Sequence, residues 1–174
     1  LSSSAALLRQ EIERLEGEYS ALQMAREVLD EANAALQSRF SPALGRRAAE
    51  IFARLTGGRY SGVVLDRAFR VSAEPAGDPA YRDAGLLSAG AAGQLYLAVR
   101  LAICDLVLPP ERNLPIVLDD ALANFDDDRC AAALRYLKEE AGKRQILLFT
   151  CHSREAEFFA GDNEVSVQRL TDAV

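Results

Sequence analysis

Leucine recurs every seven residues near the start of the chain, so that five heptads can be written with leucine at every d position. The d positions are Leu8, Leu15, Leu22, Leu29 and Leu36, and the a positions are Ile12, Tyr19, Arg26, Asn33 and Phe40. An unbroken series with polar residues at two a positions favours a two-stranded coiled coil. An amphipathic helix packed on a domain is the alternative. We predict a coiled-coil arm at residues 1–40, whose partner strand lies outside this sequence unless the chain self-associates.

A globular domain is predicted to follow the arm, over residues 41–174. Ser41-Pro42 permits a break or a new helix start, and Thr56-Gly57-Gly58 would end the helix that follows. Two β-rich runs flank Asp66-Arg67, as in a hairpin. The pattern therefore predicts a helix at 43–55, strands at 60–65 and 69–74, and a surface loop at 75–83.

Helical and strand patterns alternate beyond residue 88. The predicted elements are a helix at about 91–107, a strand at 116–118, a helix at about 127–141, a strand at 145–150, a short helix after Ser153 and an edge strand near 165–170. Alternation of this kind is typical of a parallel sheet flanked by helices. The predicted fold class is α/β.

Composition narrows the class of protein. With 49% hydrophobic and 26% charged residues in 174, the chain has room for one globular domain with an extended appendage. Glycine and polar residues interrupt the longest uncharged run, 84–99, so we expect no membrane-spanning helix. The formal net charge of −6 gives no support for nucleic-acid binding by this piece alone.

The cysteines and the start of the sequence indicate where the protein is located and whether the sequence is a fragment. Cys104, Cys130 and Cys151 lie in apolar stretches, which fits reduced, buried thiols in a cytoplasmic protein. The sequence begins at Leu1 without a secretory signal, so we expect a piece of a longer protein.

Two adjacent carboxylates, Asp119 and Asp120, end the apolar run 114–118. A buried parallel strand delivers acids to the carboxyl edge of its sheet in this form. Since successive strand residues point to opposite sides, one carboxylate can reach the water shell of a magnesium ion while the other faces an attacking water. The alternative is that the pair only caps the next turn.

Two other positions carry candidate chemistry. Ser88, Gly90 and Gly93 lie at the start of an apolar helix, where unpaired N–H groups and the helix dipole favour a phosphate, although a simple N-cap with flexible glycines is the alternative. His152, the only histidine, follows the next apolar strand. The ends of consecutive βα units would bring Asp119 and His152 to one sheet edge.

Four short motifs, in this order along the chain, resemble those of ABC-type ATPases. Leu87-Ser88-x-Gly90 with Gln94 resembles the signature motif, 116–120 resembles Walker B, Asn124-Phe125-Asp126 resembles the D-loop, and Cys151-His152-Ser153 resembles the switch histidine. With the heptad arm in front, the chain is similar to the C-terminal half of coiled-coil ATPases of the SMC, RecN, RecF, SbcC and YhaN kind. The arm would be the returning strand of the long coil.

The chain departs from the family pattern at three points. Ala89 stands where the signature commonly has Gly, and Asp120 stands where many members have Glu, although RecF-like members use Asp. A P-loop requires G-x-x-x-x-G-K-[ST], and neither Lys138 nor Lys143 lies in that pattern. The resemblance explains the missing P-loop, because in this family it lies in an N-terminal half across the coil.

The resemblance implies an ATPase, with ATP and Mg²⁺ as cofactors, that is inactive as this fragment alone. Asp119 would bind magnesium through water, Asp120 would orient or deprotonate the attacking water, and His152 would contact the γ-phosphate. The side chains or backbone of four signature residues would close over ATP held by a second head, and Asp126 would couple the two sites; the four are Ser88, Ala89, Gly90 and Gln94.

The implied partners are the N-terminal P-loop half of the same protein, a second head in an ATP-dependent homodimer, and DNA as the family's common cargo, with no membrane. The cycle would drive movements of coiled arms in DNA repair or chromosome maintenance. The alternatives are a noncatalytic coiled-coil scaffold on a degenerate nucleotide fold, and the nucleotide domain of a membrane transporter. A five-heptad arm ahead of the signature is not expected of a transporter.

Overall fold

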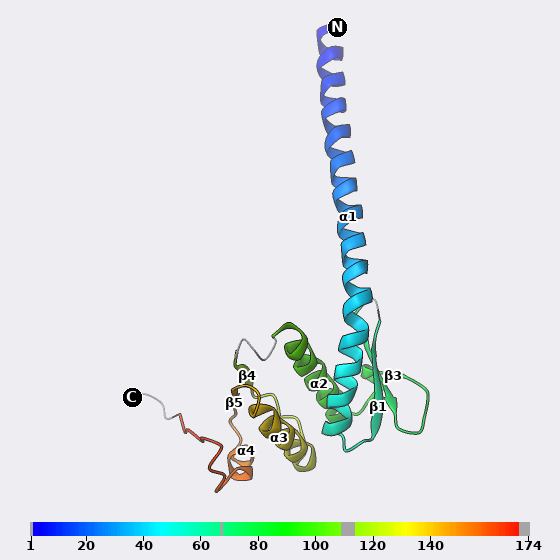
Figure 1. Ribbon diagram of the computed structural model, residues 1–174. Coiled ribbons are helices and arrows are strands. Elements are labelled where there is room, and N and C mark those ends of the chain that lie inside the picture. Colours follow the sequence, from blue (N-terminus) through cyan, green and yellow to red (C-terminus); the bar gives the residue numbers. More distant parts are fainter. Residues whose placement is uncertain (1, 67, 109–113, 171–174) are drawn as a thin grey trace. The chain divides into compact units, whose positions relative to one another are not determined.

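The computed structural model describes residues 2–66, 68–108 and 114–170, which Figure 1 shows as ribbon. The chain divides into two compact units, Leu1–Phe40 and Ser41–Val174. The elements in chain order are α1 (Ser2–Leu55), β1 (Tyr60–Leu65), β2 (Val71–Pro75), β3 (Arg82–Asp83), the 3₁₀ turn η1 (Ala84–Leu86), α2 (Ala89–Val107), β4 (Ile116–Asp119), α3 (Asp127–Ala141), β5 (Ile146–Phe149) and α4 (Ser153–Phe158).

The first unit consists of the N-terminal part of α1. The predicted helix is confirmed, and its seam is exposed along the chain: Leu8, Leu15, Leu22, Leu29, Ile12 and Tyr19 are 50 to 71% exposed, while the side chain of Leu36 lies outside the described part. Ion pairs from Arg14 to Glu11 and Glu18 stabilise the helix surface. That a second strand covers the seam stays a prediction.

The predicted break at Ser41-Pro42 is wrong, because α1 continues to Leu55 with Pro42 inside the helix. Proline lacks the N–H of one helical hydrogen bond and crowds the preceding turn, at a cost of about 3 kcal/mol. The turns that follow bury four large apolar side chains almost completely, Leu44, Ile51, Phe52 and Leu55. Each such burial stabilises by about 1.5–3 kcal/mol, which outweighs the proline.

Strands β1, β2 and β3 form an antiparallel sheet in that order. The predicted hairpin is confirmed, although β2 begins at Val71 because Phe69 adopts φ 57° in the turn. The Asp66 carboxylate organises this turn by accepting hydrogen bonds from the N–H groups of Ala68 and Arg70. The predicted loop at 75–83 is wrong at its end, where β3 pairs with Ser72 and Ala73 of β2.

Strands β4 and β5 are parallel neighbours, paired from Ile116 with Ile146 to Asp119 with Phe149. Helix α3 contacts both α2 and β5, and α4 contacts α3. The predicted α/β fold is therefore confirmed, with β5 spanning four residues rather than six. The edge strand predicted near 165–170 is wrong: these residues are described without regular structure, since a strand needs a hydrogen-bonded neighbour and this segment has none among the described residues.

Helix α2 is the core helix of the second unit. By length and composition it is the one helix among the described residues that could cross a membrane. Part of its apolar surface is used inside the unit, where Leu95, Ala98 and Ala102 are completely buried, while Tyr96 and Val107 are more than half exposed. Burial in the core therefore accounts for part of its hydropathy.

The carboxylate of Asp105, near the end of α2, joins three parts of the second unit. It accepts hydrogen bonds from Arg47 of α1 at 2.7 Å and from Arg144, just before β5, at 3.0 Å. Arg144 is buried and also donates to the carbonyl of Leu108 at 3.2 Å. Two guanidiniums on one carboxylate thus tie α1, α2 and the start of β5 together.

The three thiols differ from the prediction that all are buried. Cys130 is buried and Cys104 is half-buried, but Cys151 is exposed. Cys151 lies just beyond the end of β5, which ends at Phe149.

We expect Gly45→Ala to lower the free energy of unfolding of the second unit by about 1–3 kcal/mol, as overpacking does. A Cβ at Gly45 of α1 would lie 2.9 Å from the backbone carbonyl oxygen of Val63 in β1, so helix and strand would have to separate. Urea denaturation measures the loss. Gly17→Ala in the same helix is the matched control, because its Cβ would meet nothing within 4 Å. Equal effects of the two substitutions would contradict this packing.

Candidate functional site

The carboxyl ends of β4 and β5 meet at one edge of the parallel sheet. Asp119 is the last residue of β4 and pairs with Phe149, the last residue of β5. The N–H of Asp120 continues the ladder by donating to the Phe149 carbonyl at 2.8 Å. Both carboxylates are exposed at this edge. An exposed carboxylate at the end of a parallel strand suits Mg²⁺, which binds oxygen ligands and retains water.

Asp120 lies beside the residues that follow β5. The Sγ atom of Cys151 is 3.8 Å from both carboxylate oxygens of Asp120, and one donor atom each of Asp120, Cys151 and His152 lie within 4.8 Å of one another. Asp120 adopts φ 48°, and the His152 N–H donates to Thr150 Oγ1 at 3.0 Å. The structure thus brings Asp120 and His152 together, while their catalytic roles stay predictions.

Ser88 caps the start of α2. Its Oγ accepts from the Ala91 N–H at 3.4 Å, so the helix begins at Ala89, two residues earlier than predicted. The simple N-cap is therefore present, and it leaves the helix N-terminus with the unpaired N–H groups that an anion would need. Contact of Ser88, Ala89 or Gly90 with a nucleotide stays a prediction.

The glycines of this segment provide space for the side chains of Arg129 and Phe125. A Cβ at Gly90 would overlap the guanidinium of Arg129, and a Cβ at Gly93 would lie 2.8 Å from the ring of Phe125. Both glycines lie within helix α2. The start of α2 and the segment leading into α3 therefore pack in direct contact.

Arg129 connects these two segments by hydrogen bonds. Its Nη1 donates to Asp126 Oδ2 at 2.6 Å and its Nε donates to Gln94 Oε1 at 3.2 Å. Asp126 also caps α3, since its Oδ1 accepts from the Arg129 N–H at 2.9 Å. The sequence reasoning missed Arg129, although an Asp followed three residues later by an Arg at a helix start is a pattern that could have pointed to it.

Gln94 is 1% exposed and its amide is satisfied within the protein. Besides accepting from Arg129, it donates through Nε2 to the carbonyl of Leu55, at the end of α1, at 2.6 Å. The structure thus gives Gln94 a role in joining α1, α2 and α3. Its predicted contact with ATP stays a prediction.

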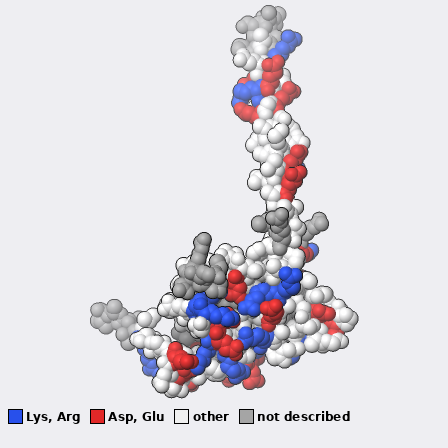
Figure 2. Space-filling model, viewed as in Figure 1, with Lys and Arg blue, Asp and Glu red and all other residues white. Residues whose placement is uncertain are grey.

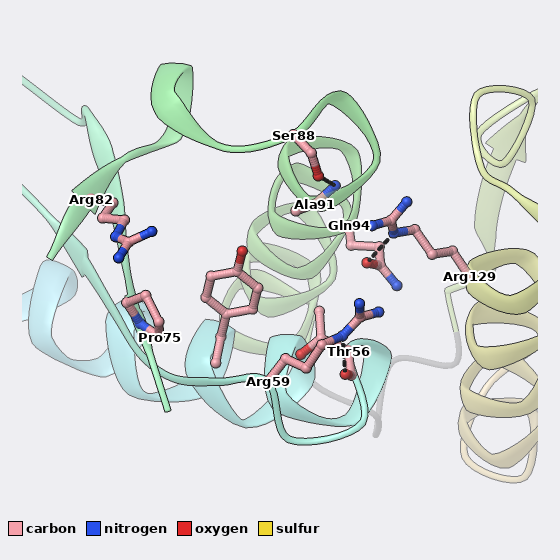
Figure 3. Close-up of a pocket in the computed structure, with 9 residues that line it drawn as sticks. Thr56, Arg59, Pro75, Arg82, Ser88, Ala91, Gln94 and Arg129 are labelled. Atoms are coloured by element: carbon pink, nitrogen blue, oxygen red, sulfur yellow. Dashed lines mark hydrogen bonds between the residues drawn. The ribbon is translucent and has the colours of Figure 1, made fainter. Parts of the chain in front are cut away.

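A pocket of about 310 Å³ adjoins the start of α2. Figure 3 shows the guanidiniums of Arg59, Arg82 and Arg129 at its wall together with Ser88 and Gln94. Arg82 is paired with Asp78 and Arg129 with Asp126. The Nε of Arg59 donates to the carbonyl of Thr56, and its positive charge at the wall favours an anion. Over the face shown in Figure 2, by contrast, basic and acidic side chains are interspersed.

Comparison with known proteins supports the motif resemblance. No known protein-family model matches the chain. It is 28% identical over 160 residues to the uncharacterized protein YhaN of Bacillus subtilis, covering 91% of this chain and 16% of YhaN. The chain therefore spans less than a fifth of the length of this relative.

Solved SMC head structures share the fold. A structure from a study of ATP-driven dimerization and DNA-stimulated activation of SMC ATPases gives a TM-score of 0.62 at 23% identity, over 82% of this chain and 85% of that one. The Smc head of Pyrococcus furiosus, bound to the C-terminal domain of ScpA, gives 0.54 at 23% identity over 87% and 38% of the two chains. The SMC head of Thermotoga maritima gives 0.53 at 21% identity over 76% and 44%.

The chain has the fold of the C-terminal half of an SMC-like ABC-type ATPase head. The resemblance based on four motifs predicts this fold, and the comparisons with solved heads agree with it.

We expect Arg129→Met to lower the free energy of unfolding by about 1–3 kcal/mol, because it leaves the buried Gln94 oxygen without its charged donor. Urea denaturation of the second unit measures this loss. Arg82→Met is the matched control from the same pocket: its ion pair with Asp78 is half-exposed on both sides, so its removal should cost about 0–1 kcal/mol. Equal losses for both variants would contradict the joining role of Arg129.

Proposed function

We propose that this chain is the C-terminal half of an ATP-binding and ATP-hydrolysing head, completed by an N-terminal half that carries the P-loop. The observation that carries the proposal is the placement of Asp119, Asp120 and His152 at the common carboxyl edge of β4 and β5. Ligands of open α/β sheets bind at that edge. Alone, the chain should be inactive, because its sequence contains no P-loop.

Three side chains at the edge would have separate tasks. Asp119 would hold a water-coordinated Mg²⁺ through its exposed carboxylate. Asp120 would orient or deprotonate the attacking water, and the nearby imidazole of His152 would donate a hydrogen bond toward the γ-phosphate. When bound, ATP and Mg²⁺ supply the phosphoryl group and the positive charge that stabilises its transfer.

The start of α2 would serve a second nucleotide. Ser88, Ala89 and Gly90 present the helix N-terminus, and the arginine-lined pocket beside it adds positive charge. This surface would close over ATP held by another head. Gln94 would hold α2 in place through its hydrogen bonds to Leu55 and Arg129, and Asp126 would couple the two sites. A solved SMC ATPase of this fold was studied for ATP-driven dimerization, which supports the proposal that this chain also acts in a homodimer.

The cycle would open and close coiled arms. The exposed seam of α1 would pair with the outgoing strand of the same protein, so that ATP-dependent head dimerization moves the arms. Work in DNA repair or chromosome maintenance in the cytoplasm is the proposed use, with DNA as cargo. Since the chain carries a net charge of −6, the contact with DNA would lie on another part of the protein.

We expect Asp120→Asn to lower ATP turnover by about 10²–10⁴-fold while ATP binding remains, because an amide cannot accept the proton. ATP binding and ATP hydrolysis are measured with Mg²⁺ for the chain alone and for the chain coexpressed with the N-terminal half of its parent. Asp128→Asn, at an exposed position of α3, is the control that should keep turnover. A pair that binds ATP and keeps its turnover in Asp120→Asn would remove Asp120 as the base, and a pair that never binds ATP would favour the scaffold alternative.

We expect Ser88→Arg to abolish ATP-dependent dimerization of reconstituted heads while each head still binds ATP. A long cationic side chain at the start of α2 would block the approach of the opposing nucleotide. Sedimentation velocity with and without ATP measures the dimer. Ser166→Arg, at an exposed position outside both sites, should dimerize normally. Normal dimers of Ser88→Arg would count against the signature role.

A further inference from the structure

Three chemically different metal donors converge beyond the ends of β4 and β5. The carboxylate of Asp120, the thiol of Cys151 and the imidazole of His152 each place a donor atom within 4.8 Å of the other two. The thiol sulfur is 3.8 Å from either oxygen of the carboxylate. All three residues are exposed, so an ion can reach them from solvent.

The backbone places these three residues beside one another. Asp120 is held by the hydrogen bond of its N–H to the Phe149 carbonyl at 2.8 Å, and its φ of 48° turns the chain at the strand end. On the neighbouring strand, the bond from the His152 N–H to Thr150 Oγ1 fixes the turn that holds Cys151 and His152. The parallel pairing of β4 and β5 therefore sets the spacing of the residues that carry the donors.

The donor set selects a class of metal. Thiolate and imidazole are borderline to soft ligands that suit Zn²⁺, whereas Mg²⁺ prefers oxygen alone. Zinc bonds of about 2.3 Å to sulfur and about 2.1 Å to oxygen at a tetrahedral angle separate the two donors by about 3.6 Å. The sulfur and oxygen are 3.8 Å apart, close to that value.

We propose that Asp120, Cys151 and His152 bind one Zn²⁺ ion, with water in the fourth position. Three protein ligands and one open position are an established form of zinc site. The site differs from the magnesium position proposed at Asp119, because it includes a thiolate and the chain's one histidine.

The other two thiols are poor competitors for the metal. Burial raises the pKa of the Cys130 thiol, and the Glu155 carboxylate 3.7 Å away raises it further. Burial also raises the pKa of Cys104, within α2. Metal binding requires the thiolate, so both environments oppose it, while Cys151 lies open to solvent.

Zinc at this site would inhibit the head. This consequence rests on the proposed function, in which Asp120 handles the attacking water and His152 contacts the γ-phosphate. An ion that binds the Asp120 carboxylate takes away the lone pairs that activation of the water needs. Its bond to the imidazole competes with the contact of His152 to the γ-phosphate. The metal would thus act as a reversible off-switch for ATP hydrolysis, removed by a chelator.

The test is a Co²⁺ titration of the tag-free 174-residue chain at neutral pH, followed by Zn²⁺. We expect one equivalent of Co²⁺ to produce thiolate-to-metal charge-transfer absorption and the intense visible bands of tetrahedral cobalt. One equivalent of Zn²⁺ should abolish both, and excess Mg²⁺ should not. In proton NMR, the single imidazole should shift with the same stoichiometry.

Variants identify the ligands. Cys151→Ser should lose the charge-transfer absorption, and Asp120→Asn and His152→Ala should each weaken Co²⁺ binding at least about tenfold. Cys104→Ser and Asp128→Asn are the matched thiol and carboxylate controls and should bind as the parent does. Far-ultraviolet circular dichroism checks that each variant is folded; Asp120, Asp128, Cys151 and His152 are exposed, and Cys104 is half-buried.

The proposal is overturned if the folded chain shows no thiolate–cobalt absorption, if Cys151→Ser retains it, or if Mg²⁺ displaces Co²⁺ as well as Zn²⁺ does. These outcomes are independent of the proposed ATPase, because metal binding is measured without ATP and without the N-terminal half. A different result is that the chain binds cobalt while the reconstituted Asp120→Asn pair keeps full ATP turnover. That result would refute the proposed catalytic role of Asp120 and leave the zinc site in place.

Discussion

The amide of Gln94 must be satisfied inside the core, and this requirement fixes three helices against one another. A buried amide that loses a partner costs about 1–3 kcal/mol, so Leu55 at the end of α1 and Arg129 near the start of α3 must both stay in reach of it. The guanidinium of Arg129 and the ring of Phe125 lie against Gly90 and Gly93, where a Cβ atom would clash with them. The end of α1, the start of α2 and the start of α3 therefore form one closely packed group.

The same group is joined to the sheet edge through a short, well-packed segment. Between Asp120 and Asp126 the chain buries Leu122 and Phe125. The carbonyl of Leu122 accepts a hydrogen bond from Arg154 of α4 at 2.9 Å, so the helix that follows His152 is tied to the segment that follows Asp120. Buried side chains and this hydrogen bond therefore connect the sheet edge with the start of α3.

Local patterns predicted the elements whose signal is local, and tertiary contacts decided the rest. Strands β4 and β5, helix α3 and the carboxylate edge follow from apolar runs and their ends. The continuity of α1 through Pro42 depends on burial of Leu44 and Phe52, which no window of sequence shows. The two-residue strand β3 exists only because β2 lies beside it, and 165–170 stays irregular without such a neighbour. The role of Arg129 depends on its hydrogen bond to Gln94, 35 residues earlier, which no local pattern shows.

The left-handed backbone at Asp120 has a consequence for which acid can stand there. A φ of 48° is tolerated best by Asp and Asn among residues with a side chain, because their short polar groups can bond locally, whereas longer side chains gain nothing that offsets the steric cost. The left-handed bend after β4 therefore favours aspartate over glutamate at this position. The departure from the usual acid is consistent with the backbone conformation of this chain.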